Sequence, residues 1–152
     1  MPMAEAPAQL HAPASHPAPH ASARLGRIER SIARAINRIR RRHGLPRLHV
    51  SGRLTRVAAW HSFDMLAHNV LSHSSSDGTP FYSRIRSAVP ARSVGETLIE
   101  YRGPCSGRRV VSYWMHSAPH RAEILAGRYR RIGVGRGLYR GTSVVTADFA
   151  SG

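Results

Sequence analysis

The sequence contains no lysine, although 23 of its 152 residues are basic. All of this positive charge is arginine, and with only 8 acidic residues the formal net charge is +15. Such a surface favours anionic partners such as nucleic acid, phospholipid headgroups or acidic wall polymers. A GC-rich coding bias would explain the same abundance of Arg, Ala, Gly and Pro, so the charge by itself identifies no partner.

Cysteine and long apolar runs are also scarce. The single cysteine, Cys105, excludes an intrachain disulfide, and no histidine or carboxylate beside it indicates a nucleophile. No run of ~18 apolar residues is present, so we expect no membrane-spanning helix and no integral membrane protein. A chain of 152 residues is long enough for one domain with a proper core.

Large apolar residues are nearly absent from residues 1–23, which consist mainly of Ala, Pro and His. A segment of this composition buries too little surface to offset its ordering entropy. We therefore predict a disordered tail over 1–23 and a single domain over 24–152. The tail also lacks the apolar run of a signal peptide, so either an export segment lies outside this chain or the protein stays inside the cell.

Apolar spacing predicts several helices. Apolar residues recur every three or four positions from Leu25, which indicates a helix that ends at Gly44 and carries arginines on its opposite face. Ser51 is the expected N-cap of a second helix. Two shorter helices are expected over residues 81–88 and from 108 to about 115.

Strand signals appear near the C-terminus. The stretch RRIGVGRGLYRGTSVVTADFA has two alternating runs around a Gly-rich turn, which predicts a β-hairpin. The earlier stretch SVGETLIEY is compatible with an extended segment or with the edge of a helix, and its pattern does not decide between them. Helices first and strands last indicate an α+β domain.

The stretch WMHSAPHRAEIL places His116 and His120 four residues apart, the spacing at which one helix offers two imidazoles to a metal ion. Pro119 lies between them and disfavours a continuous helix, because it removes a hydrogen bond and restricts Ala118. We expect two helical pieces, with a new turn around Ser117. Any partner of His120 should then come from elsewhere in the chain.

The chain resembles the bacterial branch of the CAP superfamily, which includes cysteine-rich secretory proteins, antigen 5 and plant pathogenesis-related proteins. The resemblance runs from about Ala23 to Ala150 in seven segments that occur in order: INRIRRRHGLPRL, LTRVAAWHSFDM, LSHSSSDGTPFYSRI, GETL, VVSYWMHSAPHRAEIL, RRIGVG and VVTADFA. It implies a three-layer α-β-α sandwich with a small antiparallel sheet and a cleft on one face. It also implies an extracellular or cell-envelope location.

The resemblance assigns three cleft residues, His73 from LSH, Glu96 from GETL and His120 from PHR. In some relatives the two histidines bind a divalent cation, so the resemblance implies a Zn²⁺ or Mg²⁺ site at His73 and His120. Two positions depart from the family pattern. Ser117 stands where many eukaryotic relatives have a second Glu, and Thr97 replaces the usual Asn after Glu96.

The sequence leaves three possible roles for Glu96. It can complete a three-ligand metal site with water in the fourth position, or orient an imidazole without touching the metal. It can also pair its charge with the imidazoles in a polar cleft that holds no metal. The serines at 74–76 lack the rigid arrangement with a base that a serine nucleophile requires.

Other conspicuous side chains receive structural roles. We expect Trp60 and Trp114 in the core, and His61 on a helix surface that can border the cleft. Arg84 is expected to support a loop by hydrogen bonds to carbonyl groups, with Asp148 as a candidate partner.

Three functions are compatible with these features, and we favour the first. It is a non-catalytic module that binds a lipid-like or cell-envelope ligand at the His/Glu cleft. The second is a hydrolase in which a cation-bound water is the nucleophile and Glu96 is the general base. The third is salt-sensitive anion or nucleic-acid binding by the arginines of the first helix. An aromatic content of 7% and the lack of a stacking platform make nucleic acid a poor candidate.

Overall fold

A computed structural model of the chain describes residues 25–152. The tail predicted over 1–23 lies outside the described residues. The elements follow in the order α1 (Arg27–Arg42), β1 (His49–Val50), α2 (Gly52–Ala67), α3 (Phe81–Ala88), β2 (Val94–Arg102), α4 (Gly107–Met115), α5 (Ala118–Ile124), β3 (Tyr129–Tyr139) and β4 (Thr142–Ser151).

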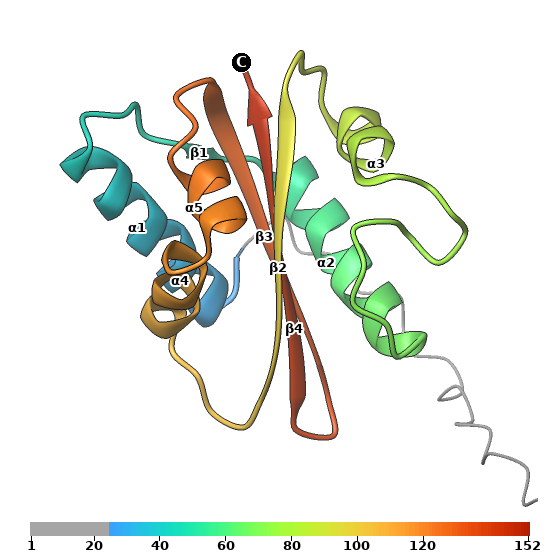
Figure 1. The fold of residues 1–152 in the computed structure, drawn as a ribbon. Coiled ribbons are helices and arrows are strands. Elements are labelled where there is room, and N and C mark those ends of the chain that lie inside the picture. Colours follow the sequence, from blue (N-terminus) through green and yellow to red (C-terminus); the bar gives the residue numbers. More distant parts are fainter. Residues whose placement is uncertain (1–24) are drawn as a thin grey trace, which may run out of the picture.

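The sheet lies between two layers of helices, as Figure 1 shows, with α1, α4 and α5 on one face and α2 and α3 on the other. The strand order is β1-β3-β4-β2. The two-residue β1 pairs with β3 in parallel, and the remaining pairs are antiparallel. This arrangement confirms the predicted α+β class and the three-layer α-β-α sandwich.

The helices begin and end where local signals predict. Ser51 caps α2 by accepting a hydrogen bond from the Leu54 amide at 3.3 Å. Gly44 lies just beyond α1 with φ of 67°, the left-handed conformation in which glycine commonly ends a helix. Pro119 lies in the first turn of α5 and Ser117 is its N-cap, so α4 and α5 are separate helices as expected. Among the described residues, no helix combines the length and the apolar character that crossing a membrane requires.

The stretch that the sequence left undecided forms the edge strand β2. Its alternate side chains pack toward different helical layers, Leu98 with Met65 of α2 and Ile99 with the core around α1 and α4. The predicted hairpin is formed by β3 and β4. Its turn consists of Arg140 and Gly141, whose φ values of 47° and 78° are both positive, as a type I′ turn requires.

Three glycines of β3 bring helix α2 close to the sheet rather than making the turn. They alternate along the strand and therefore share one face; they are Gly133, Gly135 and Gly137. A Cβ atom on Gly135 would lie 2.0 Å from the backbone nitrogen of Ala59 in α2. The absence of side chains lets the helix backbone approach the strand, and this packing places His61 of α2 over the sheet.

The two tryptophans have opposite environments. Trp114 is fully buried, and its indole nitrogen donates to the carbonyl of Leu98 at 3.0 Å. The prediction for Trp60 is wrong, because its side chain lies on the outward face of α2 and is 46% exposed. The buried positions of this helix include Leu54, Ala58 and Met65, and Trp60 lies outside their helical stripe.

Arg40 is buried, although it belongs to a helix whose other arginines are exposed. Its guanidinium donates to the carbonyls of Pro46, Ile124 and Ala126 at 2.9, 2.9 and 2.8 Å. These bonds tie α1 to the end of α5, where the helical carbonyls lack partners of their own.

Candidate functional site

A buried polar cluster surrounds Glu96 on the face of β2 that turns toward α2 and α3. The Glu96 side chain is fully buried. Its Oε1 accepts a hydrogen bond from Nδ1 of His73 at 2.8 Å, and its Oε2 pairs with the guanidinium of Arg84. Both carboxylate oxygens are therefore engaged by protein donors.

Arg84 of α3 connects Glu96 to the loop that carries His73. Its Nη1 donates to the His73 carbonyl at 3.1 Å and to Oγ of Ser75 at 2.9 Å. The predicted loop-supporting role of Arg84 is thus confirmed. Its carboxylate partner is Glu96 rather than Asp148.

His61 also belongs to this cluster and is fully buried. The prediction that it lies on a helix surface is therefore wrong. Its Nε2 donates to the carbonyl of Ser72 at 2.8 Å and lies 3.9 Å from Oε1 of Glu96. Burial lowers the pKa of His61 and favours the neutral ring. The spacing of residues along α2 could have revealed that His61 is buried. His61 follows Ala58 by three residues and precedes Met65 by four, so it belongs to the apolar stripe of this helix.

Asp148 of β4 lies directly opposite Glu96 in the sheet and is also fully buried. Within residues 25–152, no N–H or hydroxyl group donates to either oxygen of its carboxyl. Two carboxyl groups can hydrogen-bond each other only if one carries a proton. Burial, followed by the charge of Glu96, raises the pKa of Asp148 well above its usual range. The raised pKa favours a protonated Asp148, which can donate a hydrogen bond to Glu96.

Glu96 is the charged member of this carboxyl pair. Burial alone would raise the pKa of Glu96, but the hydrogen bonds from His73 and Asp148 and the charge of Arg84 outweigh it, and the net pKa is lowered. The ion pair with Arg84 balances the buried charge, while burial favours the neutral forms of Asp148 and His61. Balanced charge and satisfied oxygens are the conditions under which a buried ion pair persists.

His73 connects the buried cluster to solvent, with a side chain that is 52% exposed. The hydrogen bond to Glu96 raises the pKa of His73, and this effect exceeds the opposing effect of burial. Because Nδ1 is bound to Glu96, Nε2 is the ring nitrogen left for a ligand.

His120 comes from α5, in the opposite helical layer. Its ring lies 6.4 Å from that of Trp114, and its buried Nδ1 has no hydrogen-bond partner in the described part of the chain. Burial and then the charge of His73 lower the pKa of His120, so the two imidazoles are within electrostatic range of each other. Within residues 25–152, no hydrogen bond joins His120 to His73 or Glu96.

The described residues do not form a complete metal centre. Nowhere in residues 25–152 do three His, Cys, Asp or Glu side chains group as metal ligands. The oxygens of Glu96 are occupied, which leaves the imidazoles of His73 and His120. A catalytic zinc normally has three protein ligands. The residues therefore do not fit a catalytic zinc centre and would offer a cation two ligands at most.

A hollow of about 370 Å³ adjoins this cluster on the side of α3. It is lined by Phe81, Tyr82, Arg86, Ser93, Val94 and Arg128. The ring of Phe81, which lines this hollow, lies 5.8 Å from that of His73. The hollow offers aromatic surface together with positive charge.

Comparison with known sequences identifies similar proteins. The model of the cysteine-rich secretory protein family, abbreviated CAP, matches residues 33–149. The uncharacterized protein YkwD of Bacillus subtilis is 31% identical over 108 residues, which are 70% of this chain and 41% of that protein. The uncharacterized membrane protein YlbC of the same organism is 33% identical over 108 residues, which are 70% of this chain and 31% of that protein. The chain thus spans less than half the length of either relative.

Solved structures show the same architecture. An extracellular protein from Bacillus anthracis that contains an SCP domain matches with a TM-score of 0.71 and 28% identity, over 82% of this chain and 40% of that one. An outer surface protein from Borrelia burgdorferi matches with a TM-score of 0.71 and 20% identity, over 79% and 89% of the two chains. The match to the Borrelia protein, at 20% identity, shows similarity of fold alone.

Proposed function

The chain belongs to the cysteine-rich secretory protein (CAP) family, and from this premise we propose that it is a non-catalytic module whose ligand contacts His73 and His120. The similarity to an extracellular SCP-domain protein supports a location outside the cell or in the cell envelope. The proposal concerns this domain, because the chain covers only part of its longer relatives.

The engagement of Glu96 is the observation that carries the proposal. A general base needs a free oxygen within hydrogen-bond reach of the proton that it removes. Glu96 is buried, its oxygens are hydrogen-bonded to His73 and Arg84, and its pKa is lowered. These properties suit a residue that orients His73 better than one that accepts a proton from water.

The surroundings of His73 indicate the chemistry of the ligand. The raised pKa of His73 favours a protonated ring, which donates a hydrogen bond to a ligand oxygen. The adjoining hollow adds the rings of Phe81 and Tyr82 and the charge of Arg128. Binding sites commonly combine such apolar surface with a few polar groups that fix orientation. An oxygen-rich envelope component with rings that pack on aromatic side chains fits this combination, and peptidoglycan is the probe that we select.

Co-sedimentation with purified bacterial peptidoglycan tests the proposal. Wild-type protein should sediment with the polymer, and the double variant His73→Ala/His120→Ala should bind about tenfold more weakly, equivalent to ~1.4 kcal/mol. The matched control His49→Ala/His68→Ala removes two exposed imidazoles elsewhere and should bind like the wild type. Equal sedimentation of all three proteins would refute ligand contact by His73 and His120. Release of soluble fragments that stops on addition of chelator would refute the non-catalytic assignment.

A Zn²⁺ or Mg²⁺ ion held by His73 and His120 remains a separate prediction. Histidine NMR during cation titration tests it in the wild type and in His120→Ala. Signals of both rings that shift in the wild type, with a His73 signal that stays constant in the variant, would support the cation site. An absence of response at millimolar cation would contradict it.

A further inference from the structure

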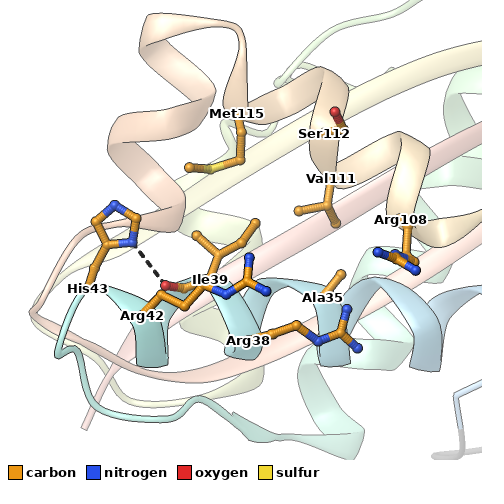
Figure 2. A pocket seen from close by; sticks show the side chains of 9 residues that line it. All are labelled: Ala35, Arg38, Ile39, Arg42, His43, Arg108, Val111, Ser112 and Met115. Atoms are coloured by element: carbon orange, nitrogen blue, oxygen red, sulfur yellow. Dashed lines mark hydrogen bonds between the residues drawn. The ribbon is translucent and has the colours of Figure 1, made fainter.

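A second candidate site lies between α1 and α4, in the helical layer that does not contribute His73 or Glu96. Figure 2 shows this groove, which has a volume of about 640 Å³. Its apolar lining comes from both helices and includes Ala35, Ile39, Val111 and Met115. Three arginines surround this apolar surface, and they are Arg38, Arg42 and Arg108.

The close contact of the two helices at one end explains where the groove lies. A Cβ atom on Gly107 would lie 2.6 Å from Oγ of Ser31 and 2.8 Å from the backbone nitrogen of Ile32. Helix α4 therefore begins in direct contact with α1. Farther along the pair, Ile39 and Met115 line open space between the helices (Figure 2).

The three guanidinium groups at the groove have no partner in the described part of the chain. Within residues 25–152, no carboxylate pairs with Arg38, Arg42 or Arg108, and no carbonyl accepts from their side chains. No acidic residue lines the groove. By contrast, Arg40 of the same helix has its guanidinium bound to four carbonyls. The groove therefore presents concentrated positive charge with free hydrogen-bond donors, which is complementary to an anion.

We propose that this groove binds a phosphate ester, with the phosphate held by the three arginines and the remainder of the molecule resting on Ile39 and Met115. A single planar guanidinium group can bind both oxygens of a carboxylate. The tetrahedral phosphate of a monoester has three terminal oxygens, so it can accept hydrogen bonds from several guanidinium groups at once. Arg38 and Arg42 are one helical turn apart on α1, and Arg108 comes from α4, so the donors approach from two sides.

His43 adds a further donor or acceptor at the end of the groove. Its Nδ1 lies 2.9 Å from the carbonyl of Ile39, as the dashed line in Figure 2 shows. Because Nδ1 donates to that carbonyl, Nε2 is left for a ligand. The site shares no residue with the Glu96 cluster, so the two proposals can fail independently.

Calorimetric titration with glycerol 3-phosphate at physiological salt tests the phosphate site. The groove variant Arg38→Gln/Arg108→Gln should lose affinity by at least about tenfold. The matched control Arg34→Gln/Arg109→Gln removes the same charge from the same two helices at exposed positions outside the groove lining, and should remain within about twofold of the wild type. Equal weakening of both variants would show a net-charge effect and overturn the site. Equal affinity of the wild type for glycerate would overturn the preference for phosphate.

Vesicles of phosphatidylcholine with and without phosphatidylglycerol distinguish the source of the phosphate. Sedimentation with the anionic vesicles that only the groove variant loses would assign the phosphate to a lipid headgroup. Binding of glycerol 3-phosphate without vesicle binding would assign it to a soluble ester. Failure of the wild type to bind either probe would overturn the proposal. Thermal unfolding of the groove variant should match the wild type, because the replaced side chains have no partners in residues 25–152.

Discussion

Replacement of Asp148 by Asn tests whether this buried carboxyl holds a proton in the folded protein. Asn has nearly the same shape, and its amide can donate to Glu96 as the protonated carboxyl does. It differs in that it does not titrate. Since Asp148 is fully buried opposite Glu96 and has a raised pKa, Asp148→Asn should preserve the fold while removing one source of pH dependence.

The expected magnitude follows from one proton. In the unfolded chain an Asp ionises near ~3.9, whereas the folded-state pKa of Asp148 is raised by burial and by Glu96. Between these two values the folded protein binds more protons than the unfolded chain. The free energy of unfolding of the wild type should therefore fall by up to about 1.4 kcal/mol per pH unit as pH rises through this window. This contribution is fully present below the unfolded pKa and is lost as pH approaches the folded pKa.

Urea unfolding followed by tryptophan fluorescence measures this dependence at a series of pH values above ~4. The stability of Asp148→Asn relative to the wild type should increase as pH rises. Asp77→Asn is the matched control, because Asp77 is exposed and the amide of Thr79 lowers its pKa. At pH values at least about one unit above ~3.9, that carboxyl is ionised in both the folded and the unfolded state, so its difference from the wild type should not vary with pH there. A pH-independent difference for Asp148→Asn would refute the assignment of the proton to Asp148.

Three further predictions concern the fold and the cluster. Arg40→Met should lower the free energy of unfolding by about 3–5 kcal/mol, because it leaves several buried carbonyls without donors; a loss below about 1 kcal/mol in urea unfolding would contradict this. Gly135→Ala should destabilise by at least about 2 kcal/mol, because the added Cβ meets the backbone of α2 rather than a flexible side chain; an unchanged urea midpoint would disprove the close approach. Glu96→Gln should lower the pKa of His73 in an NMR titration, because the charged hydrogen-bond partner is lost; an unaltered pKa would show that the bond at Nδ1 is unimportant.

Local signals explain why the helices were predictable. Ser51 and Gly44 act through their own backbone or side chain, so their capping roles are visible without the rest of the fold. Pro119 separates α4 from α5 for the same reason. The strand β2 was not decided by its sequence, because both of its faces pack against helices and this removes the polar-apolar alternation of a half-exposed strand.

Errors arose where neighbours distant in sequence decide the environment. Trp60 and His61 are adjacent on α2, and their size and polarity suggested the opposite of their observed positions. The glycines of β3 set which side of α2 meets the sheet, so the helix turns Trp60 to solvent and buries His61 near Glu96. The glycines of one strand thus select the buried face of a helix that lies more than 70 positions earlier in the sequence. The hydroxyl of Ser62, which donates to the carbonyl of Gly135 across a separation of 73 residues, is an example.

The sequence by itself determined the helix boundaries, the terminal hairpin and the identity of His73, Glu96 and His120 as residues to examine. The helices and the hairpin follow from backbone preferences of short segments, whereas the three residues follow from the resemblance to the CAP superfamily. Only the tertiary structure decided that Glu96 has both oxygens engaged and that the pKa of Asp148, its neighbour across the sheet, is raised. Protonation and ligand availability depend on burial and on charges a few ångströms away, and the folding of distant segments against one another sets both.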